Sequence, residues 1–217
     1  MKLFEYDGNG TKFLRLLSTC LVISVEWLLF SLPIFTIGAS SAAMYDMTAR
    51  MHRGEMMKPW HDFRISFKEH FKKATLTWLP LLILYIILFV DYYFIRKFDA
   101  SYSNTMLIIL SVLILLLFFI TVYVFPMLLV FSGSSWQLLW NALCLSILNV
   151  PYSILMVALY GGMLYLMSRF IFLTVFGLLV GPGLIAWINT FFLLRIFKKY
   201  LPKEPENEET EDSREND

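Results

Sequence analysis

Long apolar runs recur along the chain, and five of them exceed the roughly 20 residues of helix that cross a hydrocarbon core of about 30 Å. These segments lie at residues 14–37, 74–95, 105–131, 147–168 and 170–196. Runs this continuous predict helices, since a backbone that spans lipid must satisfy its own hydrogen bonds. The alternating pattern typical of a transmembrane barrel is absent. The pattern therefore predicts an all-α, polytopic transmembrane helical bundle of about five spans, occupying residues 1–203.

Aromatic residues recur at helical spacing in the polar segment between the first two runs. The rings are Trp60, Phe63, Phe67 and Phe71, and the cations on the adjoining face are Arg64, Lys68 and Lys72. At 100° per residue the four rings fall within an arc of about 80°. This pattern predicts an amphipathic helix in the cytoplasmic interface, with rings in acyl chains and cations at anionic headgroups. Packing of the same rings on the protein's own helices is the alternative, and the two are compatible.

Two further segments are too polar to span. Residues 132–146 carry serines, Trp136 and Trp140 among leucines without a charge, which favours a short in-plane helix at the bilayer interface. Residues 204–217 are acidic and contain no apolar residue apart from Pro205. They predict a disordered cytoplasmic tail.

Composition agrees with a membrane protein of one domain. Hydrophobic residues make up 58% of the 217 positions, against about 45–50% in ordinary soluble domains. The formal net charge of +1 hides an asymmetry, because eight of the 17 acidic residues follow Lys203, together with a single basic one, Arg214. Basic flanks on a membrane protein indicate topology and contact with anionic lipid. We expect no nucleic acid partner.

The basic residues also predict an orientation. With five spans, the loop between the first two spans and the C-terminal flank share one side. That side holds 11 basic residues and the opposite side six. Because loops rich in Lys and Arg stay in the cytoplasm, this count predicts the N-terminus outside and the C-terminus in the cytoplasm.

Known catalytic signatures are missing from the sequence. There is no phosphate-binding glycine loop with Lys, no His-Glu-x-x-His and no Gly-x-Ser-x-Gly. His52, His61 and His70 are spaced nine apart and would point in opposite directions on a helix. Cys20 and Cys144 lie in apolar runs, as buried small hydrophobes do. We therefore expect no enzyme, no cofactor and no metal site.

Glu26 is the one acidic side chain deep in an apolar run. An ionised group at the centre of a span costs about 2.5–3.5 kcal/mol or more. The residue should face the bundle, either as a proton- or substrate-coupled carboxylate or as a neutral acid bonded to a neighbouring helix. Asn189 is a candidate partner, and the two form a candidate intramembrane polar site.

Backbone breakers predict kinks and close helix contacts. The residues concerned are Pro33, Gly38, Pro126, Gly177, Gly181, Pro182 and Gly183. Proline removes a helix donor, which lipid tolerates only where protein covers the freed group. Small residues four apart permit close packing, within one chain or between copies. The oligomeric state stays open.

The chain resembles the YesL family, bacterial membrane proteins catalogued as a domain of unknown function. The resemblance rests on residues 27–40, Trp-Leu-Leu-Phe-Ser-Leu-Pro-Ile-Phe-Thr-Ile-Gly-Ala-Ser, and on Arg53-Gly54-Glu55. It also rests on the Phe63, Phe67 and Phe71 series and on Tyr123-Val124-Phe125-Pro126. It implies a bacterial cell membrane and a link to carbohydrate uptake, because family members often adjoin carbohydrate ABC-transporter genes. Family members usually have an apolar residue at the position of Glu26, which argues against a family-wide role for this carboxylate.

Two functions follow as hypotheses. The first is a non-enzymatic accessory component associated with carbohydrate uptake, with a carbohydrate ABC transporter or another membrane protein as partner. The second is a small transporter or channel subunit that uses Glu26 as an intramembrane polar site. Against the second, the five runs show no inverted repeat of the kind many transporters have.

Overall fold

The computed structural model describes residues 9–97, 103–131 and 133–200. They form seven α-helices and one short 3-10 turn. The elements are α1 (Asn9–Phe30), η1 (Ile34–Thr36), α2 (Ile37–His52), α3 (Pro59–Lys97), α4 (Ser103–Val130), α5 (Ser135–Leu148), α6 (Val150–Arg169) and α7 (Ile171–Tyr200). The predicted all-α class is confirmed. Five of these helices, α1, α3, α4, α6 and α7, are long and apolar enough to cross a membrane.

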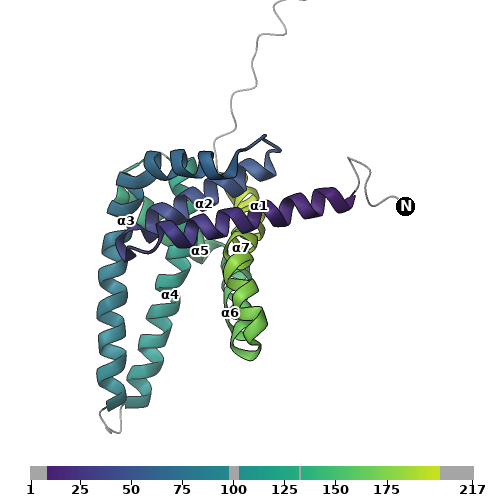
Figure 1. Ribbon diagram of the computed structural model, residues 1–217. Helices are drawn as coiled ribbons and strands as arrows, with labels where there is room; N and C mark the ends of the chain where they lie inside the picture. The colour runs from purple at the N-terminus through teal and green to yellow at the C-terminus, as the bar shows by residue number, and fades with distance from the viewer. Residues whose placement is uncertain (1–8, 98–102, 132, 201–217) are drawn as a thin grey trace, which may run out of the picture.

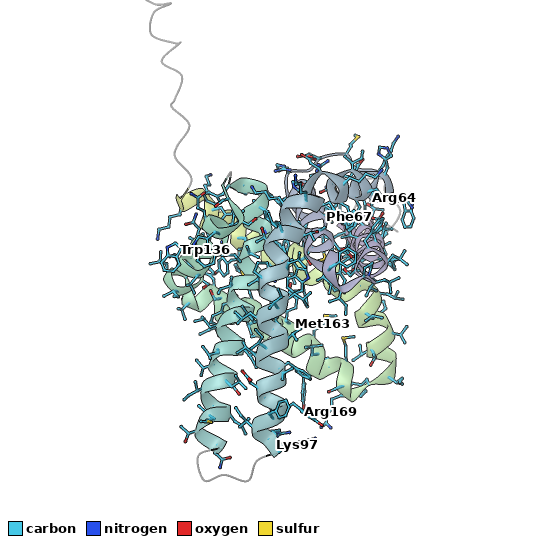
Figure 2. The ribbon with its side chains drawn as sticks, turned by 90° about the vertical axis from the view of Figure 1, so that its left-hand side faces the viewer. Arg64, Phe67, Lys97, Trp136, Met163 and Arg169 are labelled. Atoms are coloured by element: carbon cyan, nitrogen blue, oxygen red, sulfur yellow. The ribbon has the colours of Figure 1, made fainter. Side chains whose placement is uncertain are left out.

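Two helical hairpins descend from a broader layer of helices, as Figure 1 shows. The hairpins are formed by the later part of α3 with α4, and by α6 with α7. The upper layer contains α1, α2 and the start of α3. Lys97 and Arg169 mark the lower ends of the hairpins, and Arg64 and Trp136 lie near the upper end (Figure 2). Acidic tail residues 204–217 lie outside the described residues.

Helix α2 is the centre of the upper layer. Every residue from Gly38 to Ala49 is buried, although the segment is too polar to be a span. Small side chains allow this burial, since they let α1, α3, α4 and α7 approach α2 closely. Sequence patterning assigned no element here and missed the most enclosed helix of the fold.

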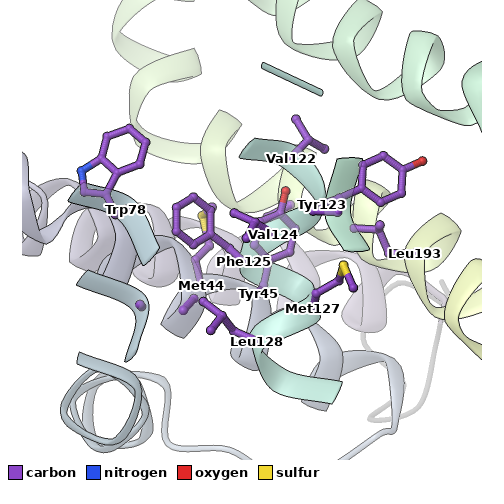
Figure 3. Close-up of a cluster of buried hydrophobic side chains, with 14 of the residues drawn as sticks. Met44, Tyr45, Trp78, Val122, Tyr123, Val124, Phe125, Met127, Leu128 and Leu193 are labelled. Carbon is purple, nitrogen blue, oxygen red and sulfur yellow. The ribbon is translucent and has the colours of Figure 1, made fainter. Parts of the chain in front are cut away.

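The hydrophobic core forms where α2 meets α3 and α4. Met44 and Tyr45 of α2 lie in one cluster with Trp78 of α3 and Phe125 of α4 (Figure 3). The rings of Trp78 and Phe125 are tilted at 53°, with centroids 6.0 Å apart. The Trp78 indole N–H also donates to the carbonyl of Ile34, at 2.9 Å, so η1 is tied to α3. This packing holds the break between α1 and α2 in place.

The first helix differs from the expected 14–37 segment. It ends at Phe30, and Pro33 lies at the N-cap of η1, between α1 and α2. Thr36 supports this turn, because its hydroxyl lies 2.6 Å from the carbonyls of both Phe30 and Pro33. Pro33 therefore separates two helices, whereas the sequence suggested a kink late in one.

Helix α5 takes the place of the short in-plane helix expected at 132–146. Its N-terminus has a capping box, in which the Ser134 hydroxyl accepts from the Gln137 N–H and the Gln137 side chain accepts from the Ser134 N–H. Trp136 and Trp140 are both exposed, at 76% and 60%. Their placement agrees with an interfacial role.

Candidate membrane interface and buried polar layer

Helices α1 and α7 cross at the Gly181-Pro182-Gly183 segment inside α7. The Gly183 N–H donates to the hydroxyl of Ser24, at 2.8 Å, and this hydroxyl also lies 3.2 Å from the carbonyl of Val180. A Cβ at Gly183 would lie 2.5 Å from the carbonyl oxygen of Cys20. Only glycine permits this approach. The proline-containing segment is thus covered by protein, as a helix in lipid requires.

Glu26 is enclosed where α1 passes the start of α3. It has no exposed surface, and neither carboxylate oxygen has a hydrogen-bond partner within the described residues. The guanidinium of Arg64 is the positive group that acts on it electrostatically. Glu26 lies four residues before the end of α1, so it occupies the last helical turns and not the middle of a span.

Asn189 lies elsewhere, beside a pair of tyrosines. The hydroxyls of Tyr45 on α2 and Tyr160 on α6 are 3.2 Å apart, and the side chain of Asn189 on α7 lies near both. Its amide nitrogen and oxygen fall outside hydrogen-bonding geometry, and the side chain is fully buried. No contact joins it to Glu26 among the described interactions, so these residues occupy two separate polar positions.

Two further polar links join α2 to α7. The hydroxyls of Thr48 and Thr190 lie 2.8 Å apart. Closer to the end of α2, the His52 ring nitrogen Nε2 lies 2.8 Å from the carbonyl of Trp187, and the two rings stack with centroids 4.9 Å apart. Together with the tyrosine pair, these contacts form a polar layer that fixes α2 against the α6–α7 hairpin.

An aromatic cavity of about 300 Å³ lies between the hairpins. Its lining includes Trp27, Trp78, Phe118 and Tyr160. The polar atoms of this lining are engaged with protein, since the Trp27 indole N–H donates to Ser41 and the Tyr160 hydroxyl meets Tyr45. The cavity therefore presents mostly apolar surface.

The ring stripe at the start of α3 divides into a buried and an outer part. Phe63 is fully buried, with its ring centroid 5.7 Å from that of Phe30, and Phe67 lies 4.7 Å from the same ring. Trp60 and Phe71 are 46% and 37% exposed. Phe63 therefore packs on α1 and cannot contact lipid, which corrects the expectation for that residue.

The cations of the stripe face outward. Arg64, Lys68 and Lys72 are all exposed, and the Arg64 guanidinium lies 4.5 Å from the Trp60 ring centroid. At the lower ends of the hairpins, Lys97 and Arg169 also lie over tyrosine rings, at 4.5 and 5.9 Å. Cations paired with rings at both ends match the two interfaces of a bilayer.

Asp62 stabilises the start of α3. Its carboxylate accepts from the Lys58 N–H at 2.8 Å, and a His61 ring nitrogen lies 3.2 Å away. The Lys58 N–H, together with His61, holds the pKa of Asp62 below its usual value.

The predicted small-residue contacts lie within the chain. A Cβ at Gly38 would lie 2.5 Å from the Cβ of Trp78, so α2 and α3 approach closely there. Gly177 and Gly181 face Met167 and Met163 of α6. The other predicted breakers, Pro126 and Pro182, lie inside α4 and α7. Pro80, which lies inside α3, was not named from the sequence, although a proline in an apolar run is itself a sign of a possible kink.

Metal-binding geometry is not present in the part of the chain that the structure describes, where no three His, Cys, Asp or Glu side chains gather. His52 meets a backbone carbonyl, and His61 pairs with Asp62.

Comparison with known proteins identifies one domain. Residues 20–92 match the family model described as "Protein of unknown function, DUF624". The chain contains a DUF624 domain. The match extends from the middle of α1 through α2 and nearly to the end of α3, and so covers residues 27–40 and 53–55, on which the YesL resemblance partly rests. No curated protein and no solved structure matches the chain. The DUF624 description carries no activity, and the YesL name stays a resemblance.

Proposed function

We propose that this multi-pass membrane protein is a non-enzymatic accessory component that associates with another membrane protein. The enclosure of its polar groups is the observation that carries the proposal. Glu26 and Asn189 are both fully buried, and neither lines the cavity of about 300 Å³ between the hairpins. A transporter needs a polar path that water or substrate can reach. A packed polar layer instead favours a structural or regulatory role.

The proposed partner is a carbohydrate importer of the ABC type. Support for this partner comes from the YesL resemblance alone, through the genes that adjoin family members. The apolar outer faces of the hairpins offer the surface for such a contact within the bilayer. Exposed apolar residues of α4 include Ile108 and Val112.

A small transporter or channel subunit is the second candidate. It is favoured by the carboxylate of Glu26 and the amide of Asn189, which are buried outside hydrogen-bonding geometry, since buried polar groups without hydrogen bonds occur at functional sites.

Orientation belongs to the same proposal. We place the protein in a bacterial cell membrane, with the α2–α3 loop and the C-terminal end of α7 in the cytoplasm. Basic residues concentrate at both places, among them Arg53, Lys58, Lys198 and Lys199.

Purification and flux measurements separate the two candidates. The tagged chain is purified from its own membranes in mild detergent, and the co-purifying proteins are quantified. The accessory role predicts importer membrane subunits in near-stoichiometric amount, and a fall in uptake of the importer's sugar when the gene is deleted. Sugar or ion flux in proteoliposomes that hold the chain alone, abolished by Glu26→Gln, would refute the accessory role and support the transporter.

A further inference from the structure

Helix α1 runs in a different direction from the other four long apolar helices. In Figure 1 it extends across the tops of the hairpins, while α4, α6, α7 and the later part of α3 descend side by side. In the view turned by 90°, α1 is seen nearly end-on while the α3–α4 hairpin still runs vertically (Figure 2). Its 22 residues make it about 33 Å long. If the hairpins cross the bilayer, α1 lies along its surface.

The faces of α1 suit such a position. At 100° per residue, Leu14, Leu17, Leu21, Val25 and Leu28 fall on one arc of about 80°. Leu14 and Leu21 are 66% and 40% exposed.

The cations Lys12 and Arg15 lie on a different face of α1, where they line an open hollow of about 610 Å³. The hollow is closed on its other sides by the end of α2, the α2–α3 loop and Trp187 of α7. One leucine arc and one cationic face are the pattern of a helix that lies in the headgroup region.

The distribution of charge points the same way. Among the described residues, a spanning α1 leaves ten basic residues on the side of the α2–α3 loop and five opposite. An in-plane α1 moves Lys12 and Arg15 to the loop side, so the division becomes 12 to three. The three remaining residues are Arg96, Lys97 and Arg169, at the hairpin tips. The in-plane position gives the stronger positive-inside bias.

The environment of Glu26 agrees with this arrangement. The positive group that acts on it is Arg64, an exposed residue at the start of α3, near the upper end of the molecule (Figure 2). Near this end, a carboxylate avoids the full free-energy cost of an ionised group at the centre of the hydrocarbon layer.

We infer that α1 is an in-plane helix seated in the cytoplasmic leaflet, so that the chain crosses the bilayer four times and both its ends lie in the cytoplasm. The leucine arc enters the acyl region, and Lys12 and Arg15 meet anionic headgroups. The N-terminus then lies opposite to its place in a five-span topology.

Cysteine labelling in cells tests the sidedness. The full chain carries Cys20→Ala and Cys144→Ala, with one new cysteine at Lys12, Glu55 or Lys97. A membrane-impermeant maleimide should label Lys97→Cys in intact cells, and Lys12→Cys and Glu55→Cys only after permeabilisation. Labelling of Lys12→Cys from the same side as Lys97→Cys would overturn the inference, because α1 would then span.

Spin-label depth measurements in anionic vesicles provide an independent test. Labels at Leu14 and Leu21 should report equal, shallow depths, since the two residues lie on one arc of an in-plane helix. Ile108 and Leu115 of α4 are the matched control, because they are also exposed and also seven residues apart. That control pair should differ by about 10 Å in depth, as the rise of a spanning helix requires. An equal difference between Leu14 and Leu21 would refute the in-plane position.

Discussion

Replacement of Gly183 by alanine tests the close crossing of α1 and α7. The added Cβ would lie 2.5 Å from the Cys20 carbonyl oxygen and 2.8 Å from the Ser24 hydroxyl oxygen. Ordinary contact begins at 3.4 Å, so α1 and α7 must separate by about 0.9 Å. Because the atom in the way is backbone, no side-chain rotation relieves the clash. The shift would also lengthen the bond from the Gly183 N–H to Ser24.

Two opposing terms set the size of the effect. Overpacking of a close contact costs about 1–3 kcal/mol, whereas alanine in a helix is favoured over glycine by roughly 0.5–1 kcal/mol. We expect Gly183→Ala to lower the free energy of unfolding by about 1–2 kcal/mol after both terms. For a chain of this size, each kcal/mol corresponds to about 2–4 °C in Tm, so the Tm should fall by roughly 2–8 °C.

Gly161→Ala is the matched control, because it makes the same chemical change inside α6. A Cβ there would meet nothing within 4 Å. Only the preference of a helix for alanine over glycine remains, so the Tm should stay level or rise by up to about 4 °C. Thermal unfolding of both purified variants in one detergent measures the two shifts. Shifts of the same sign would refute the close crossing of α1 and α7.

Three further predictions concern the polar groups. Glu26→Gln should fold and express normally, while Glu26→Lys should lower the free energy of unfolding by about 3–5 kcal/mol, as a buried uncompensated charge does. Equal thermal stability of the two variants would contradict the burial of Glu26. A double-mutant cycle with Tyr45→Phe and Tyr160→Phe should give a coupling of about 0.6 kcal/mol, and zero coupling would exclude the hydroxyl pair. Because the pKa of Asp62 is lowered in the folded chain, its contribution is present above the ordinary carboxyl pKa and is lost as pH falls below it. The stability advantage of wild type over Asp62→Asn should therefore vanish at acid pH, and a constant difference would contradict this.

Long continuous apolar runs were enough to predict the long helices. A run such as 105–131 is long and continuous, and only a helix satisfies its backbone in lipid, so α4 could be located from sequence alone. Helix α5 followed from tryptophans without charges, and its capping box, Ser134 with Gln137, is itself a sequence signature. Its in-plane position stays a prediction.

Helix α2 could not be predicted in the same way. Its segment, Ile37 to His52, is rich in alanine, serine and methionine and also carries Asp46 and Arg50, so it lacks the continuous apolar run that predicts a span. Burial here depends on small side chains that admit four neighbouring helices, which is a property of the assembled fold. The end of α1 was missed for a related reason, because apolar residues continue beyond Phe30 while the backbone turns at Pro33.

The separation of Glu26 from Asn189 shows the limit of reasoning from residue type. Both are polar residues in apolar helices, which made each a plausible partner of the other. The way the helices cross keeps the two residues apart. Helix α1 contacts α7 through Ser24 and Gly183, six residues before Asn189, and then continues towards the start of α3. Glu26 thereby comes under the charge of Arg64, while Asn189 faces the tyrosines of α2 and α6. Variants at the two positions should therefore affect stability additively, since residues without shared partners rarely couple.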